Sequence, residues 1–290
     1  MKGTAISLAI VISGASWAGT TKPIAYRSVL SNGVRYHAVV ADMRSNRVAV
    51  ETAASSRFRT ASSLVRDNKA TAAITGTFFN PASALPVADV LVDGKLVAEG
   101  NRGSVLGVTW FGDVRVFDIP YRQTFNWFPY RYALRGTVRI MSGGVVAPNP
   151  KAQKFRDSRV WSKAKRTAAG VTKDGNLVFI ATNSNVYLRD IGNAMKKLGV
   201  VDAVALDGGS STHLSYRGKS VISAGRSLTN MLILKELSAD AGDWAQYPIR
   251  RRHAGPATFL VTCPTKYWPL PTATTAKPTS ERQASLGNRK

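Results

Sequence analysis

The sequence predicts an α+β fold with a mixed, largely antiparallel sheet that is built from hairpins and packed against a few helices. Five tight-turn pairs separate β-rich runs, whereas only two segments have a helical pattern. The order along the chain is hairpins, a helix, a strand and hairpins again, which is typical of this class. The turn pairs are Asn32-Gly33, Asp93-Gly94, Gly112-Asp113, Asp174-Gly175 and Arg217-Gly218.

Three segments around these turns predict hairpins. They are "ADVLVDGKLVAEG" (88–100), "GVTWFGDVRVFD" (107–118) and "AGVTKDGNLVFIAT" (169–182). The Asn-Gly and Asp-Gly pairs are the preferred central residues of type I′ turns, which join neighbouring antiparallel strands. We therefore expect most of the sheet to be antiparallel.

The two helical segments are residues 190–198 and 60–68. The first has apolar residues at helical spacing, lysines in its last turn and Gly199 directly after it. The nearly continuous apolar run 200–206 follows Gly199 and predicts a strand buried on both faces.

Composition divides the 290-residue chain into three parts. Residues 1–18 are typical of a secretory signal peptide, with Lys2, a short apolar run and small residues before Ala18; a buried N-terminal strand or helix is the alternative. We expect the globular domain to span 19–263 and the Pro-, Thr- and Lys-rich segment 264–290 to be disordered. The protein would then be exported, to a periplasm or the extracellular space, with no transmembrane segment after the signal.

The net charge of +23 lies mostly on the predicted domain. Residues 1–18 hold one positive charge and 264–290 a net four, so +18 remains between them. Such a charge attracts anionic polymers or sugar phosphates, although it could also serve only solubility. The one cysteine, Cys263, excludes a disulfide framework.

The stretch "AVALDGGSSTHLSYRG" (203–218) ends the apolar strand in chemically active residues. Asp207 is followed by Gly208 and Gly209, then by three hydroxyl residues and His213. Glycines permit a close backbone approach, and successive N–H groups with hydroxyl donors can hold an anion. The alternative is an Asx-type turn that caps a strand. The hydroxyl residues are Ser210, Ser211 and Thr212.

A second apolar strand, 72–74, also breaks into a Gly- and hydroxyl-containing segment. "TGTFFNP" supplies Thr75, Gly76 and Thr77, then two aromatic residues and an asparagine. Two aromatics after a glycine are also common in a hydrophobic core. The two aromatic residues are Phe78 and Phe79, and the asparagine is Asn80.

These segments resemble the phosphodiester glycosidase family over roughly residues 70–235. "TGTFFN" is similar to the family's Asn-Gly-Gly/Thr-Phe-Phe element, and "RTAAGVTKDGNLVFI" to its Arg-Thr-Ala strand and hairpin. "RDIGNAMKKLGVVDAVALDGGSST" resembles its helix and Asp-Gly-Gly-Gly-Ser-Ser element, and "GRSLTNMLIL" its closing Arg and Asn element. Two departures are Thr75, where the family has Asn, and one glycine fewer after Asp207.

The resemblance implies hydrolysis of a sugar 1-phosphodiester, such as an N-acetylglucosamine 1-phosphodiester, in an anionic glycan or glycolipid. Asp207 would be the catalytic carboxylate, with Arg166 and Arg226 as phosphate ligands. His213 could be a general acid or an orienting residue. The remaining substrate-binding residues would be Thr75, Gly76, Thr77, Phe78 or Phe79, Asn80, Gly208, Gly209, Ser210, Ser211, Thr212 and Asn230.

Other readings stay open from the sequence. A non-catalytic module that binds anionic polymers could use the same fold. The aromatic and basic stretch 121–136 would suit nucleic acid, but the predicted export signal weighs against it. We expect no cofactor. The usual zinc-binding patterns are absent from the sequence, whereas a structural cation such as calcium would be compatible with the sequence. The sequence leaves open the sugar, the aglycone, the stereochemical outcome, the second catalytic carboxylate and the oligomeric state.

Overall fold

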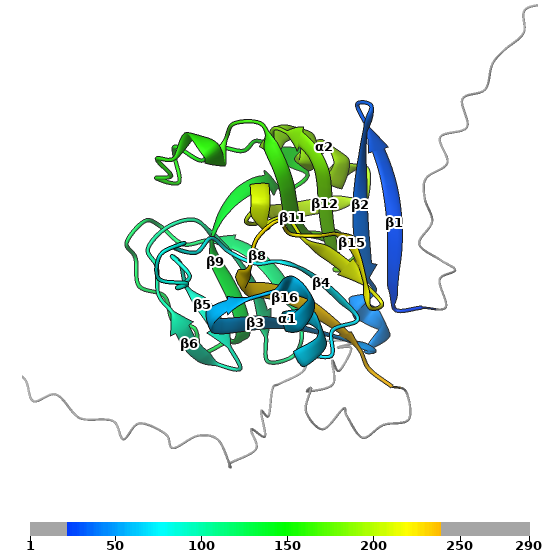
Figure 1. Cartoon of the computed structure of the whole chain (residues 1–290), viewed down its shortest axis with the longest axis horizontal. Coiled ribbons are helices and arrows are strands. Elements are labelled where there is room, and N and C mark those ends of the chain that lie inside the picture. Colours follow the sequence, from blue (N-terminus) through cyan, green and yellow to red (C-terminus); the bar gives the residue numbers. More distant parts are fainter. Residues whose placement is uncertain (1–21, 239–290) are drawn as a thin grey trace, which may run out of the picture. The chain divides into compact units, whose positions relative to one another are not determined.

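The computed structural model describes residues 22–238, which form two β-sheets and two α-helices (Figure 1). Every strand pair in this part of the chain is antiparallel. The prediction of hairpin-built antiparallel structure is thus confirmed, while the mixed component is not found and the fold is dominated by its sheets. The predicted signal (1–18) and tail (264–290) lie outside the described residues, as do the ends of the predicted domain.

The first sheet has eleven strands, eight of which follow the order β1-β2-β12-β11-β13-β9-β5-β6. β7 and β10 also pair with β9, and β8 pairs with β7. The strands are β1 (Ile24–Ser31), β2 (Val34–Ala41), β5 (Val90–Val92), β6 (Lys95–Ala98), β7 (Ser104–Thr109), β8 (Val114–Asp118), β9 (Tyr130–Ser142), β10 (Val145–Val146), β11 (Ala164–Thr172), β12 (Leu177–Val186) and β13 (Val200–Ala205).

The second sheet has five strands in the order β15-β14-β4-β16-β3. Its strands come from both ends of the described chain, and β16 lies between β4 and β3. They are β3 (Val48–Arg59), β4 (Ala72–Thr75), β14 (Leu214–Tyr216), β15 (Lys219–Ile222) and β16 (Leu228–Glu236).

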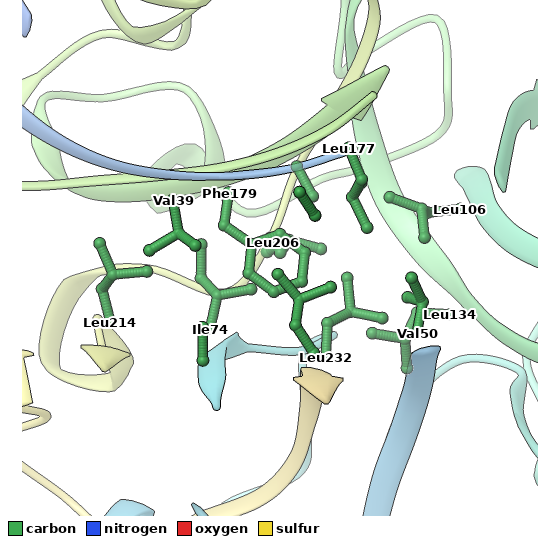
Figure 2. Close-up of a cluster of buried hydrophobic side chains, with 14 of the residues drawn as sticks. Val39, Val50, Ile74, Leu106, Leu134, Leu177, Phe179, Leu206, Leu214 and Leu232 are labelled. Carbon is green, nitrogen blue, oxygen red and sulfur yellow. The ribbon is translucent and has the colours of Figure 1, made fainter. Parts of the chain in front are cut away.

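The main hydrophobic core lies between the two sheets. Figure 2 shows Val39 and Phe179 of the first sheet pointing toward Ile74, Leu214 and Leu232 of the second. All five side chains are fully buried, because alternate residues of each strand face the opposite sheet. This layer aligns the ends of β4 and β13, where both predicted site segments begin.

Each helix covers the outer face of one sheet. Helix α2 (Leu188–Lys196) packs against the first sheet through residues such as Ile191 and Met195. Helix α1 (Ala61–Asp67) packs against the second sheet through Leu64. Both helices were predicted, and α2 begins two residues earlier than expected because the Asp190 carboxylate accepts a hydrogen bond from the Tyr187 N–H, 2.9 Å long.

The predicted hairpins are all present, but their turns differ in kind. Asn32-Gly33 and Asp93-Gly94 have positive φ at both residues, as type I′ turns require, and so does Arg217-Gly218. At Asp174-Gly175 only the glycine has a positive φ. There the Gly175 N–H donates to the Thr172 carbonyl, so the connection is a longer loop than the predicted I′ turn.

Candidate active site

The two predicted site segments meet where β13 and β4 end. The Asp207 N–H donates to the Gly76 carbonyl over 2.9 Å. The Thr75 hydroxyl accepts from the His213 N–H at 3.0 Å and donates to the Ser211 carbonyl. The structure therefore brings together loops that are more than 130 residues apart in sequence.

Asn230, in β16, holds the second of these loops in place. Its side-chain amide accepts from the Thr77 N–H at 2.6 Å and donates to the Thr77 carbonyl at 3.1 Å. Gly76 packs directly on it, since a Cβ at Gly76 would lie 2.0 Å from the Asn230 Oδ1. The Asn230 side chain can therefore occupy this position only because residue 76 has no Cβ.

Asp207 is the half-buried carboxylate at this junction. Burial raises the pKa of Asp207 to about 6, and three contacts oppose the rise: a hydrogen bond from Ser211, the positive charge of Arg226 and a backbone hydrogen bond from Gly208. The Thr167 hydroxyl donates to the Asp207 carbonyl at 2.6 Å and fixes the backbone. The carboxylate is thus mostly ionised at pH 7, yet close enough to titration to take up a proton.

Arg226 places a cation beside this carboxylate. Its guanidinium carbon lies 4.2 Å from the centre of the Phe79 ring, and its charge lowers the pKa of Asp207. The neighbouring Gly225 N–H donates to the Ser210 carbonyl at 2.8 Å, which ties the Arg226 loop to the glycine turn. Stacking on an aromatic face keeps the guanidinium plane oriented.

Arg166 lies in β11, the strand that pairs with β13 just before Asp207. The register pairs Ala168 with Ala205, and the Leu206 N–H donates to the Thr167 carbonyl at 3.0 Å. The Arg166 guanidinium is buried and donates to backbone carbonyls. These carbonyls belong to Ser162, Arg159 and Val186. Its role as a phosphate ligand stays a prediction.

The glycine turn after Asp207 is tightly packed. A Cβ at Gly208 would lie 2.5 Å from the Lys165 carbonyl oxygen, so only glycine fits there. Gly209–Ser211 form a 3-10 turn in which the Ser211 N–H donates to the Gly208 carbonyl. The N–H of Thr212 likewise donates to Gly209, so these two amides stabilise the turn itself.

Three predicted substrate ligands have contacts with groups other than Asp207. The fully buried Thr77 donates its hydroxyl to the Arg135 carbonyl at 2.8 Å. Phe78 packs edge-on against Phe155 with 6.1 Å between ring centres. Asn80 is exposed, and its side chain accepts from the Ala82 N–H within a turn.

His213 is 1% exposed and lines a cavity that also includes Arg226. Burial lowers its pKa to about 4, so the imidazole is neutral at pH 7. A neutral imidazole could not act as a general acid with the ease of an imidazolium.

One buried ion pair supports the site and was missed in the sequence. Arg135 Nη1 lies 3.0 Å from Asp89 Oδ2, and Asp89 accepts a further hydrogen bond from the Gly100 N–H at 2.6 Å. The Thr77 hydroxyl donates to the Arg135 carbonyl, so the backbone that carries this ion pair also holds the loop after β4 in place. An arginine within the apolar run of β9 was the signal that could have revealed it.

The described residues 22–238 contain no group of three or more His, Cys, Asp or Glu side chains that could hold a metal ion. Over the same range, neither helix has the length and apolar character needed to cross a bilayer.

A family model described as phosphodiester glycosidase matches residues 68–235, more than half of the chain. A search of curated protein sequences found no match.

Three solved structures share the fold at low sequence identity. The catalytic domain of zebrafish N-acetylglucosamine-1-phosphodiester alpha-N-acetylglucosaminidase, solved auto-inhibited by its pro-peptide, is 18% identical, with TM-score 0.61 over 73% of this chain and 82% of that one. A hypothetical protein from Synechocystis is 15% identical, with TM-score 0.60 over 73% of this chain, which spans only 62% of its length. A putative exported protein from Burkholderia pseudomallei is 15% identical, with TM-score 0.50 and coverage of 71% and 74%.

Proposed function

Because the chain belongs to the phosphodiester glycosidase family, we propose that it hydrolyses the glycosidic bond of a sugar 1-phosphodiester in an anionic glycan or glycolipid. The observation that carries this proposal is the position of Asp207 where two distant loops join, with the positive charge of Arg226 acting on its carboxylate. A carboxylate beside a cation suits a substrate whose sugar develops positive charge while its phosphate stays negative.

In the proposed reaction, water attacks the anomeric carbon and the bond from that carbon to the phosphate oxygen breaks. The leaving phosphomonoester takes the electron pair, so it needs little help from an acid. Asp207 would stabilise the positive anomeric centre or accept the proton of the attacking water, and Arg226 would hold the phosphate oxygens. The pKa of about 6 for Asp207 suits a group that must be ionised and yet accept a proton.

Export is part of the proposal. The pattern of residues 1–18 supports it, and so does the shared fold of a Burkholderia protein described as a putative exported protein. The chain's +23 charge would attract an anionic glycan in that compartment.

The test is to incubate the mature protein with UDP-GlcNAc and a panel of sugar 1-phosphodiesters, and to measure free sugar. Asp207→Asn keeps the shape of the side chain but removes its charge, and should lower the rate by about 10² to 10⁴. Asp174→Asn, at an exposed turn, is the matched control. Binding without sugar release by the wild type would indicate the alternative function, a non-catalytic binder of anionic polymers.

A further inference from the structure

Residues 151–165, between β10 and the start of β11, form a surface segment that we call the basic segment (Figure 1, green). It holds six lysines and arginines, all exposed, and one acid, Asp157. Asp157 pairs with Arg159, with 2.6 Å between Oδ2 and Nη2. The other five cations form no ion pair with a carboxylate in residues 22–238. They are Lys151, Lys154, Arg156, Lys163 and Lys165.

The basic segment is attached to the fold at three points. Phe155 is buried against Phe78. The Gln153 side chain accepts from a backbone N–H of β9 at 2.9 Å and donates to a serine hydroxyl of β7 at 2.6 Å. The buried guanidinium of Arg166 donates to two carbonyls of the segment. The cations therefore stand on a fixed backbone, which lowers the entropy lost when a ligand binds.

Aromatic rings hold two of these lysines in place. The Lys151 Nζ lies 5.4 Å from the centre of the Trp161 ring, and the Lys163 Nζ lies 5.3 Å from the centre of the Tyr187 ring. Each ammonium group covers a ring face on which a nucleobase would otherwise stack. The surface therefore presents positive charges to a ligand in preference to stacking platforms.

Two arginines outside the basic segment extend this surface. Arg102 donates from Nη1 to the Lys154 carbonyl at 3.0 Å. The guanidinium carbons of Arg102 and Arg122 lie 5.6 Å and 5.2 Å from the centre of the Tyr121 ring. Neither arginine forms an ion pair with a carboxylate in the part of the chain that the structure describes. The unpaired cations thus continue from the basic segment to the loop after β8.

The other end of the basic segment reaches the candidate site. The Lys165 carbonyl oxygen would lie 2.5 Å from a Cβ at Gly208, so the segment ends against the glycine turn that follows Asp207. A chain lying along these cations could therefore extend to the site.

The composition of the surface indicates which kind of anion it fits. Exposed ion pairs are weak one at a time, so several unpaired cations suit a ligand that repeats its negative charge along a chain. The basic segment exposes no large apolar side chain, whereas segments that dock into a bilayer insert such side chains. These features favour a hydrated polymer over a membrane.

We propose that the basic segment, together with Arg102 and Arg122, binds a polymer of phosphodiesters joined through sugars or polyols, and leads this polymer to Asp207. Binding of the polymer depends on the surface alone, whereas its delivery to Asp207 rests on the proposed function. Of the two substrate classes in that function, the surface selects a phosphate-bearing glycan over a glycolipid.

The first test measures binding of fluorescent poly(glycerol phosphate) to the mature protein by anisotropy. Changing Lys151→Gln, Lys154→Gln and Lys163→Gln together should raise Kd about five- to fiftyfold, as expected for the loss of three exposed ion pairs. The matched control, Lys69→Gln, Lys173→Gln and Lys219→Gln together, removes the same charge from other exposed positions. Its Kd should stay within about twofold of wild type, because salt screens distant charges.

The conservative variant Lys151→Arg, Lys154→Arg and Lys163→Arg keeps the charge and should bind as wild type does. Equal weakening in the two glutamine variants, or an unchanged Kd when the basic segment is altered, would overturn the binding surface. Tighter binding of an oligonucleotide with the same number of phosphates, or of phosphatidylglycerol vesicles, would overturn the choice of polymer.

The second test measures sugar release from poly(glycerol phosphate) that carries a terminal N-acetylglucosamine 1-phosphodiester. In the basic-segment glutamine variant, kcat/KM for this polymer should fall by the same factor as binding, while kcat/KM for UDP-GlcNAc stays unchanged. Equal effects on the two substrates would overturn delivery to Asp207. If neither substrate releases sugar although the binding results hold, the proposed function fails and the binding surface stands.

Discussion

Replacing Asp207 by asparagine should make the protein more stable at neutral pH while lowering its activity by about 10² to 10⁴. Burial raises the pKa of Asp207 from its ordinary 3.8 to about 6, so the folded state keeps an ionised carboxylate at a cost. Asparagine has nearly the same shape and carries no charge. The variant would therefore not have the free-energy cost of burying an ionised carboxylate, which the wild type bears in full above pH 6.

The magnitude follows from the size of the pKa shift. A rise of about two units corresponds to about 3 kcal/mol, at 1.36 kcal/mol per unit. Between pH 4 and 6 the folded state of the wild type binds more protons than the unfolded state, so its free energy of unfolding falls as the pH rises. The amide accepts less well from Ser211 and Gly208 than a carboxylate does, so we expect a net gain of about 2 kcal/mol at pH 7.5.

The assay is urea unfolding followed by tryptophan fluorescence for wild type and Asp207→Asn, at pH 4, 5, 6 and 7.5. The difference in the free energy of unfolding should grow across this range and level off above pH 6. Asp174→Asn, in an exposed turn, should show no such pH dependence. A variant less stable than wild type at pH 7.5, or a difference independent of pH, would refute the reasoning that Asp207 is held in a desolvated site.

Three further predictions concern the same site. Sugar release, measured as kcat/KM against pH, should be half-maximal near pH 6 and rise above it, because Asp207 must be ionised and its pKa is raised to about 6. Arg226→Lys keeps the charge but loses the guanidinium fork and its stacking on Phe79, so kcat/KM should fall on the order of tenfold or more, with weaker binding by calorimetry. Asn230→Ala removes two buried hydrogen bonds to Thr77, and should lower the free energy of unfolding in urea by about 2 to 4 kcal/mol.

Local patterns predicted most of the elements of this fold. Turn pairs such as Asn32-Gly33 marked hairpins because positive φ is a local requirement, and Thr60 marked the start of α1, where its side chain accepts from the Ser63 N–H. The division into two facing sheets was not predictable in the same way. β3 pairs with β16 from the far end of the described chain, and nothing local to Val48–Arg59 indicates that partner.

The candidate site shows the same limit. Asp207 and the Thr75 segment were found from sequence because both are polar breaks at the ends of apolar strands. Asn230 appeared only through the family resemblance, although its two bonds to Thr77 are evident in the structure. The sequence could not show that burial lowers the pKa of His213 to about 4, because the residues around it come from segments far apart in the chain.

The central position of β16 in the second sheet has a consequence for how the chain acquires its structure. β16 lies between β4 and β3, and Lys235 pairs with Glu51 at 2.7 Å across 184 residues. Local hairpins such as β11–β12 can form as soon as they leave the ribosome, whereas the second sheet must wait for residues 228–236. Pulse-labelled hydrogen exchange during refolding should therefore protect β11–β12 before β4. Because Asn230 on that late strand fixes the Gly76 loop, the nascent chain would carry no assembled candidate site until its synthesis has passed β16.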